Sequence, residues 1–278
     1  MKVYPFKIPK PLENQLVVQE DVLTTFYNKL HQHKEIQISL IVKGQGKLLA
    51  GDGIHYFTSG DIFVLGGNLP HMFQSSPHFI ESHMISLFFT KNTFGKIFFD
   101  LPDLTELKSF FSSSETGFKV LSNQIKIANK IQGLAQTNNT KRFVLFLELL
   151  VLLNQVRKET LAKFIYSKTL SSQEGERLRT VVDFVIKNFH AEIQLQQIAK
   201  MAYMTPTAFC RFFKQRTNKT FFQFLIAIRI QHASQLLVTK KDLSVSEIAN
   251  LSGFNSSTNF NKKFKLIKGV SPTIYRNQ

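Results

Sequence analysis

The chain has 278 residues and a formal net charge of +16, a length that allows two domains of ordinary size. Its single cysteine, Cys210, excludes an intramolecular disulfide framework and a cysteine-rich zinc finger. The first residues lack the apolar core of a secretory signal, and the most apolar run, Phe143–Leu153, is too short to span a bilayer. We therefore expect a soluble, cytoplasmic protein with no membrane partner.

The positive charge is concentrated toward the end of the chain. From Glu176 onward sixteen Lys and Arg stand against five Asp and Glu, a formal charge of +11, whereas the preceding residues carry +5. A module that binds a polyanion requires such an excess, because contacts with phosphates release counterions. A basic protein of the membrane surface is the alternative, but it needs a basic amphipathic helix rather than compact helical pairs.

The first part of the chain has the pattern of a β domain. Residues 1–24 contain several prolines and are expected to be extended. From Phe26 to about Phe89 short apolar runs are interrupted by glycine and aspartate, and within this region the stretch from Ile36 to Ser76 predicts four or five strands. Ile38, Leu40 and Val42 supply one inward face by alternation. Strands at this spacing favour an antiparallel barrel or sandwich.

The middle of the chain has a helical pattern, from Phe94 to Leu170. The segment KRFVLFLELLVLLNQVRKE is apolar on nearly all sides, so we expect this helix to be buried. It can pack within its own chain or against a second subunit, and the sequence leaves both open. Residues 167–176 are small and polar and are predicted to link a domain at 1–166 to a domain at 177–278.

The last eighty residues contain one helix-turn-helix pattern twice. The copies read LQQIAKMAYMTPTAFCRFFKQRTN and VSEIANLSGFNSSTNFNKKFKLIKG. Ile198 recurs as Ile248 fifty positions later, and Phe209 recurs as Phe260 fifty-one positions later, so the extra residue falls in the turn. Arg229 lies between the copies and is expected to be a structural ion-pair partner rather than a residue that reads bases.

The second helix of each copy has a clear start and a polar face. Thr205 can cap the first of these helices, and Asn255 or Ser256 can cap the second. Ser244 and Glu247 match a capping box for the helix that precedes the second. Phenylalanines spaced three to four apart should face inward. That leaves these residues facing outward: Thr207, Cys210, Arg211 and Lys214 in the first copy, and Ser257, Thr258, Asn261, Lys262 and Lys265 in the second.

These outward residues suit a helix that reads the major groove of DNA. Short polar side chains near the helix start allow close approach, and Arg, Lys or Asn further along can contact base edges and phosphates. An ordinary solvated and basic helix face is the alternative. Two copies with the same polarity favour nucleic-acid binding.

Residues 195–276 resemble the DNA-binding domain of the arabinose-regulator (AraC/XylS) family of bacterial transcription activators. The resemblance rests on IAKMAYMTPTAFCRFFKQRTNKTFFQFL, RIQHASQLL and VSEIANLSGFNSSTNFNKKFKLIKGVSPTIYR. It implies that helices starting near Thr205 and Asn255 enter successive segments of the major groove and are joined by a helix at Phe222–Leu237. The positions that match the family's base-reading sites are Thr207, Cys210 and Arg211, then Ser257, Thr258, Asn261 and Lys262.

Residues 20–90 resemble the cupin-like sensor half of the same family, through HQHKEIQISLIVKGQGKL and FTSGDIFVLGGNLPHMF. The resemblance implies a β-barrel whose mouth binds a small effector. By family position, the candidate effector-binding residues are His31, His33, Gln37, His71 and Phe73.

Cupin enzymes hold one metal ion with a His-x-His pair, a Glu and a distant His, and three of these positions are matched here. The position of the carboxylate is occupied by Gln37, whose neutral amide is a poor substitute as a metal ligand. We therefore predict no metal and no cofactor, with the histidines lining a pocket mouth or forming local hydrogen bonds. His55, His78 and His83 lack ligand-like spacing and are expected to be at the surface or structural.

The sequence thus predicts an α+β protein of two domains, a cupin-like β-barrel followed by helices and then an all-α domain with two helix-turn-helix motifs. The predicted function is sequence-specific regulation of transcription, as an activator in the family's usual mode. The expected partners are double-stranded DNA, a small-molecule effector, RNA polymerase if the protein activates, and a second copy, since the family dimerises through helices after the barrel. We expect no catalysis; the alternative is a metal-dependent cupin enzyme with a nucleic-acid-binding tail.

Overall fold

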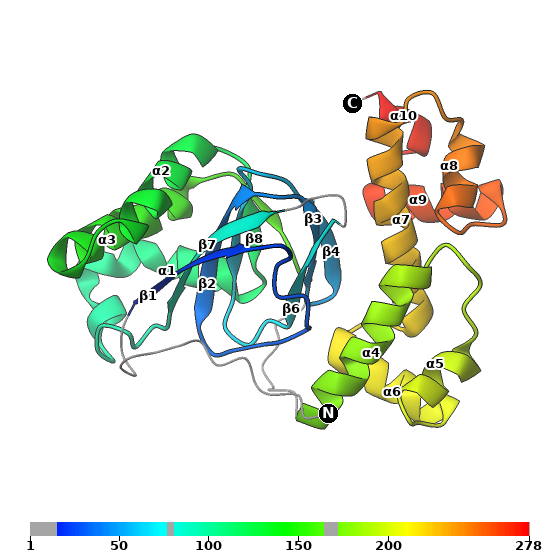
Figure 1. The fold of residues 1–278 in the computed structure, drawn as a ribbon, viewed down its shortest axis with the longest axis horizontal. Coiled ribbons are helices and arrows are strands. Elements are labelled where there is room, and N and C mark those ends of the chain that lie inside the picture. Colours follow the sequence, from blue (N-terminus) through cyan, green and yellow to red (C-terminus); the bar gives the residue numbers. More distant parts are fainter. Residues whose placement is uncertain (1–15, 77–80, 164–171, 278) are drawn as a thin grey trace. The chain divides into compact units, whose positions relative to one another are not determined.

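The computed structural model describes residues 16–76, 81–163 and 172–277 (Figure 1). The chain separates into two compact units, the N-terminal unit Met1–Ser172 and the C-terminal unit Gln173–Gln278. Helix α4 begins at Ser172, so the second half of the linker predicted at 167–176 is helical. Residues 164–171, which include its first half, lie outside the described residues.

The N-terminal unit is built on two antiparallel sheets. The larger sheet has the strand order β1-β7-β2-β5-β8-β9, and the smaller has the order β4-β3-β6. The strands are β1 (Val17–Leu23), β2 (Ile36–Lys43), β3 (Gly46–Ala50), β4 (Gly53–Phe57), β5 (Ile62–Leu65), β6 (His71–Ser75), β7 (Ser82–Phe89), β8 (Phe118–Val120) and β9 (Lys158–Thr160).

Helices cover one face of the larger sheet (Figure 1). They are α1 (Lys108–Glu115), α2 (Gln124–Ala135) and α3 (Asn139–Gln155), preceded by the 3-10 turns η1 (Phe98–Asp100) and η2 (Pro102–Leu107). The rings of Phe89 in β7 and Phe146 in α3 meet with centroids 4.8 Å apart, edge to face. This contact ties the longest helix of the unit to the sheet.

Strand β2 separates two cores because its side chains alternate between two faces. Ile36, Ile38 and Leu40 belong to the core under the helices, whereas Ile41 belongs to the core between the two sheets. The core between the sheets is rich in aromatic rings, including Phe26, Phe57, Phe63 and Phe73. The alternation predicted for β2 is therefore confirmed for Ile38 and Leu40.

Two features of the secondary structure were not predicted. Residues 1–24 were expected to be extended, and within them Val17–Leu23 forms strand β1, which pairs along its whole length with β7. From Ile36 to Ser76 the chain forms the five strands β2 to β6, so the predicted number of four or five is confirmed, and β7 follows them. Strands β8 and β9 interrupt the segment predicted to be helical; with three residues each, they are too short to show a period of two.

Helix α3 is buried on one side only. Phe146, Leu149 and Leu150 are fully buried, but Val144 is 48% exposed and Leu147 is only partly buried. The expectation that this helix is buried all round therefore needs correction, and an apolar stripe stays accessible within the N-terminal unit.

The C-terminal unit is entirely helical among its described residues. Its helices are α4 (Ser172–Asn188), α5 (Leu195–Met201), α6 (Pro206–Thr217), α7 (Phe221–Thr239), α8 (Val245–Leu251), α9 (Ser257–Lys268) and α10 (Pro272–Arg276). Helix α7 contacts both copies of the repeat. Phe221 packs on Phe209 and Phe213 of α6, and Leu237 lies in a core with Phe260 of α9.

Helix α7 is long and apolar enough, by length and composition, to cross a membrane. Its apolar side chains are instead used inside the C-terminal unit, where Phe221, Ile228, Ile230 and Leu237 are almost completely buried. The helix is therefore the central core element of this unit.

Candidate functional site

The first repeat copy presents its polar residues on one face of α6. Thr205 caps this helix as predicted, since its hydroxyl accepts a hydrogen bond from the main-chain N–H of Ala208, and Pro206 occupies the first helical position. Phe209 and Phe213 point into the core and are fully buried. The outward residues predicted on this helix, Thr207, Cys210, Arg211 and Lys214, are all exposed.

The second copy repeats this arrangement on α9. Ser256, rather than Asn255, caps the helix by accepting from the N–H of Asn259, and Asn255 is exposed beside it. The predicted capping box of Ser244 and Glu247 is present at the start of α8. The outward residues predicted on α9, Ser257, Thr258, Asn261, Lys262 and Lys265, are likewise all exposed.

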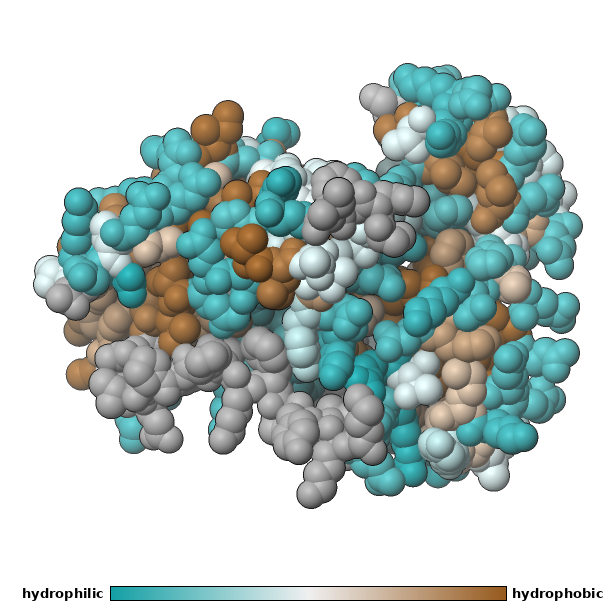
Figure 2. Space-filling view, in the orientation of Figure 1, coloured by the Kyte–Doolittle hydropathy of each residue, from teal (hydrophilic) through white to brown (hydrophobic). Residues whose placement is uncertain are grey.

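The two exposed faces have matching chemistry. Thr207 corresponds to Thr258, Arg211 to Lys262 and Lys214 to Lys265, and neither α6 nor α9 contains an acidic residue. Among the described residues, none of these four cations forms an ion pair. Two helices of one unit thus display unneutralised positive charge beside short hydroxyl side chains. Polar side chains also line the edge of this unit around α5 and α6 (Figure 2).

Among the residues that the structure describes, Arg229 in α7 has no acidic partner for the ion pair that we predicted. Its Nε donates to the carbonyl oxygen of Phe189 at 2.7 Å, and its Nη2 donates to that of Ala191 at 2.8 Å. A run of carbonyls at a helix end carries partial negative charge and can take the place of a carboxylate. The sequence could not reveal this, because the partner atoms belong to the main chain.

A second candidate site lies in the N-terminal unit, where the predicted effector residues meet. The main chains of His31 and His71 form an isolated β-bridge, and the ligand atoms of His31, His33 and His71 all lie within 4.8 Å of one another. One terminal atom of the Gln37 amide lies 3.1 Å from Nε2 of both His33 and His71. The structure therefore brings four of the five predicted residues together.

The fifth residue, Phe73, lies in the aromatic core between the two sheets. It is 3% exposed, and its ring contacts those of Phe26, Phe57 and Phe63. Its burial gives it a clear structural role in the core between the sheets. A role in effector binding stays a prediction for all five residues.

The protonation of the buried histidines follows from their hydrogen bonds. In each ring the Nδ1 atom donates to a main-chain carbonyl oxygen: Lys29 for His31, Glu35 for His33 and Leu69 for His71. A neutral ring that donates from Nδ1 has only a lone pair at Nε2. Burial lowers the pKa of His71 well below its ordinary value, and the neighbouring His31 and His33 lower it further. We infer that His71 is neutral at pH 7.

Gln37 is placed to satisfy two of these rings at once. The nitrogen and oxygen of an amide exchange places when its plane turns by half a turn, so the hydrogen-bond partners decide which atom faces which side. Both rings offer a lone pair at Nε2, and only the NH2 group can donate to two lone pairs, so the NH2 group faces the rings. The amide oxygen then accepts a hydrogen bond from Ser39 Oγ, which lies 2.8 Å from that end of the amide and 2.9 Å from Ser86 Oγ. The result is a connected polar network inside an otherwise apolar N-terminal unit.

This network is a poor metal site. Three imidazoles with Nδ1 tied to carbonyls have the tautomer that metal ligands use. However, the carboxylate of the metal-binding pattern is replaced by an amide, which lies between two of the rings. Of the other histidines, His55 bonds to Leu161 O at 2.9 Å and His83 to Glu20 at 2.7 Å, as expected for structural or surface roles; His78 lies outside the described residues.

Comparison with known families finds two matches along the chain. Residues 15–87 match the family described as the AraC-like ligand binding domain, and residues 198–278 match the family described as a helix-turn-helix domain. The first match contains the buried polar network, and the second contains both repeat copies from Ile198 onward.

Curated relatives are bacterial regulators. An uncharacterized HTH-type transcriptional regulator of Bacillus subtilis (strain 168), YdeC, is 25% identical over 265 residues, which are 90% of this chain and 86% of the relative. An uncharacterized HTH-type transcriptional regulator of Staphylococcus aureus (strain COL) is 22% identical over 245 residues. The aligned part covers 87% of this chain but only 31% of that longer relative.

Solved structures with detectable likeness include the DNA-binding domain of AdpA in complex with a target DNA, which is 34% identical over 35% of this chain and 86% of that chain, with a TM-score of 0.34. ToxT from Vibrio cholerae is 16% identical over 94% of this chain and 98% of its own, with a TM-score of 0.36. The alternative of a cupin enzyme finds no support among the matches. With a ligand-binding domain and a helix-turn-helix domain matched in the order predicted from its motifs, the chain belongs to the AraC family of helix-turn-helix transcriptional regulators.

Proposed function

We propose that this regulator binds double-stranded DNA by inserting the exposed faces of α6 and α9 into successive segments of the major groove. The observation that carries the proposal is the match between these faces, each of which combines short hydroxyl groups with cations and lacks acidic residues. The proposed contact residues are Thr205, Thr207, Cys210, Arg211 and Lys214 of the first copy and Asn255, Ser257, Thr258, Asn261, Lys262 and Lys265 of the second.

The side chains divide into base readers and phosphate contacts. Arg211 can donate two parallel hydrogen bonds to guanine, and Asn261 can pair with the edge of adenine. Lys214 and Lys265 lie one turn further along their helices and are suited to phosphates. Two helices on one face of a duplex should be separated by about one helical turn, roughly 34 Å.

We also propose that the N-terminal unit controls DNA binding through a small effector or through assembly. His31, His33, Gln37, His71 and Phe73 are the proposed effector residues; support comes from the convergence of four of them in a buried polar network. An effector can act only if it binds two arrangements of the protein with different affinity. Activation through RNA polymerase, a homodimer formed through α3 and a cytoplasmic location complete the proposal.

Replacing Arg211 by Ala tests the DNA interface. The change should weaken binding to a selected duplex by about 1–3 kcal/mol and relax the preference at one base pair in one half of the site, if the guanidinium pairs with guanine. Affinity and base preference would be measured by titration of duplexes carrying single substitutions. Lys241→Ala, which removes a positive charge outside α6 and α9, serves as the control and should leave the base preference intact. Unchanged preference in Arg211→Ala would refute the assignment.

A further inference from the structure

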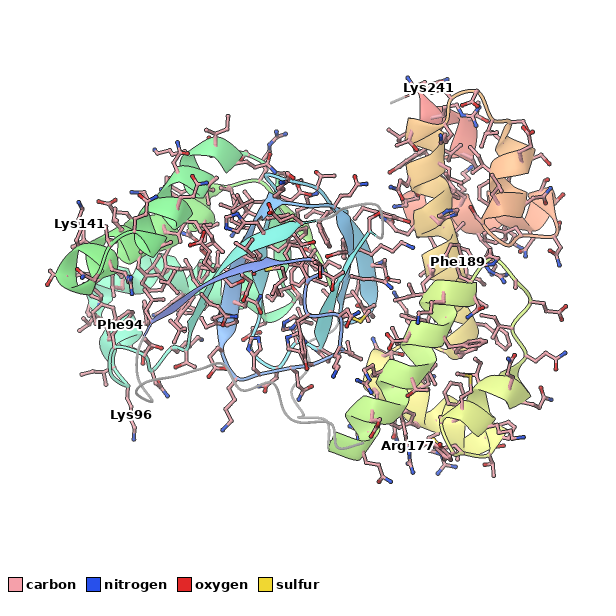
Figure 3. All side chains as sticks on the ribbon, in the orientation of Figure 1. Phe94, Lys96, Lys141, Arg177, Phe189 and Lys241 are labelled. Carbon is pink, nitrogen blue, oxygen red and sulfur yellow. The ribbon has the colours of Figure 1, made fainter. Side chains whose placement is uncertain are left out.

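Three segments of the C-terminal unit meet at one point between the two repeat copies. They are the residues that follow α4 (Phe189–Ala191), the middle of α7 and the turn between α8 and α9 (Ser252–Phe254). Phe189 is seen at the end of α4 beside α7 in Figure 3. We call this meeting point the junction.

Arg229 joins the first two segments of the junction and contacts the third. Its two hydrogen bonds hold the carbonyls of Phe189 and Ala191, and its guanidinium lies over the ring of Phe254, 5.9 Å from the centroid. The planar guanidinium forms this two-point contact in a fixed orientation. His232, one turn further along α7, adds a 3.0 Å hydrogen bond to Ser252 and a ring contact with Phe189.

Gly253 allows the turn of the second copy to approach the end of α4. Its φ of +83° is in the left-handed region, and a Cβ at this position would lie 2.6 Å from the carbonyl oxygen of Phe189 and 2.9 Å from Arg229 Nε. No side chain fits at such distances without displacing main-chain atoms. The contact therefore requires glycine for both its conformation and its lack of volume.

The corresponding position in the first copy shows that the turn itself does not demand glycine. Tyr203 occupies it with φ of +56°, and its side chain is 87% exposed. Both copies thus use a left-handed residue in the turn, but only the second has another segment against it. The glycine at position 253 is therefore required by the contact between the second copy and the residues that follow α4, and not by the helix-turn-helix motif itself.

The two copies do not pack closely beside the junction. A groove of about 370 Å³ lies there, lined on one side by residues 192–196, where the first copy begins, and on the other by Gly253 and Asn255 of the second, with Arg229 among the α7 residues that line it. Helix α7 is a single rod with each copy packed on one end. The second copy is held on α7 by a shared apolar core, and the junction adds the direct contacts between its turn and the residues that follow α4.

We propose that the junction formed by Arg229 and Gly253 sets the separation and rotational phase of α6 and α9, and that Arg229 is a positioning residue for the spacing between the two halves of the DNA site. The inference rests on the proposed function, in which both helices bind one duplex. Loosening the junction should leave each helix able to bind its own half-site and should reduce the penalty for duplexes whose halves are wrongly spaced.

The experiment compares the full chain with Arg229→Lys and Gly253→Ala on a duplex selected from random DNA and on versions with one base pair inserted or deleted between the halves. Insertion rotates one half by about a tenth of a turn. The ratio of the Kd for the altered duplex to the Kd for the selected duplex is the readout. We expect this ratio to fall at least fivefold in both variants. Arg229→Lys keeps the positive charge and the apolar stem, so we expect it to fold. It therefore provides the test even if the Gly253→Ala variant does not fold.

Two controls separate spacing from stability. Arg276→Met removes another arginine that donates to a main-chain carbonyl, that of Leu243, away from the junction, and Tyr203→Ala changes the equivalent turn of the first copy. Both should keep the wild-type ratio. A wild-type ratio in Arg229→Lys overturns the inference about the junction. If Arg211→Ala also leaves base preference unchanged, the proposed function itself has failed.

Discussion

Buried imidazole rings make the stability of the N-terminal unit depend on pH. Burial lowers the pKa of His31 to about 4, and it lowers the pKa of His71 well below the ordinary 6.5. As the pH falls below 6.5, these two imidazoles become protonated in the unfolded chain but stay neutral in the folded chain. The stability that these rings contribute is therefore complete above pH 6.5 and is lost as the pH falls toward 4.

We expect the melting temperature of the full chain to decrease between pH 7 and pH 5, with about 1–2 kcal/mol of the loss due to His31 alone. In His31→Gln the decrease should be less steep, since one ring that resists protonation is gone. His190→Gln, at an exposed position of the C-terminal unit, is the matched control and should keep the wild-type slope. Thermal unfolding at closely spaced pH values measures the slopes. Identical slopes in all three proteins would contradict the argument.

The sequence predicted which polar residues enter the barrel but not how they bond. His31, His33, Gln37 and His71 were expected together from their positions in a family pattern, and they do meet. The position of the Gln37 amide between two rings depends on side-chain torsion angles, and the spacing of residues in the sequence does not determine these angles. Arg229 illustrates the same limit, because main-chain carbonyls as partners are invisible in a sequence.

At the scale of elements, helix starts were predictable because the residues that cap a helix are its immediate neighbours in the chain. The cap at Thr205 and the box of Ser244 with Glu247 are present as predicted. Strands β8 and β9 were not predictable, because their pairing partners lie far away in the sequence and their own three residues have no period. Elements defined by neighbouring residues can thus be predicted from the sequence, whereas short strands defined by distant pairing partners cannot.

Replacing Ser244 by Ala tests the capping box. The Ser244 hydroxyl accepts from the N–H of Glu247, and the Glu247 carboxylate accepts from the N–H of Ser244 at 2.7 Å. Loss of the hydroxyl should lower the free energy of unfolding by about 1 kcal/mol. Ser246→Ala, within the same helix, removes a hydroxyl that bonds to the exposed Ser257 side chain and should change the free energy of unfolding by less than about 0.5 kcal/mol. Urea unfolding measures both, and equal effects would count against the cap.

At the scale of the whole molecule, the composition and repeats of the sequence were enough to predict two domains of different class. The chain divides into compact units at Ser172 and Gln173. What the sequence left open was the partner of α3, because an apolar helix can be covered by its own chain or by a copy of it. The structure answers this only in part: Leu149, Leu150 and Leu153 are buried within the unit, but the stripe through Val144, Leu147 and Val151 is not fully covered.

This accessible stripe leads to a prediction about assembly. If α3 joins two chains as proposed, Val144→Lys places a charge in the centre of an apolar contact and should convert dimers to monomers at micromolar concentration, since a buried unpaired charge costs several kcal/mol. Ile125→Lys is the matched control, because Ile125 is 80% exposed on the neighbouring helix α2. Sedimentation at several protein concentrations measures the mass. The prediction is contradicted if the wild-type protein stays monomeric, or if Val144→Lys forms dimers to the same extent as Ile125→Lys. Either result would mean that the stripe on α3 is not a dimer interface.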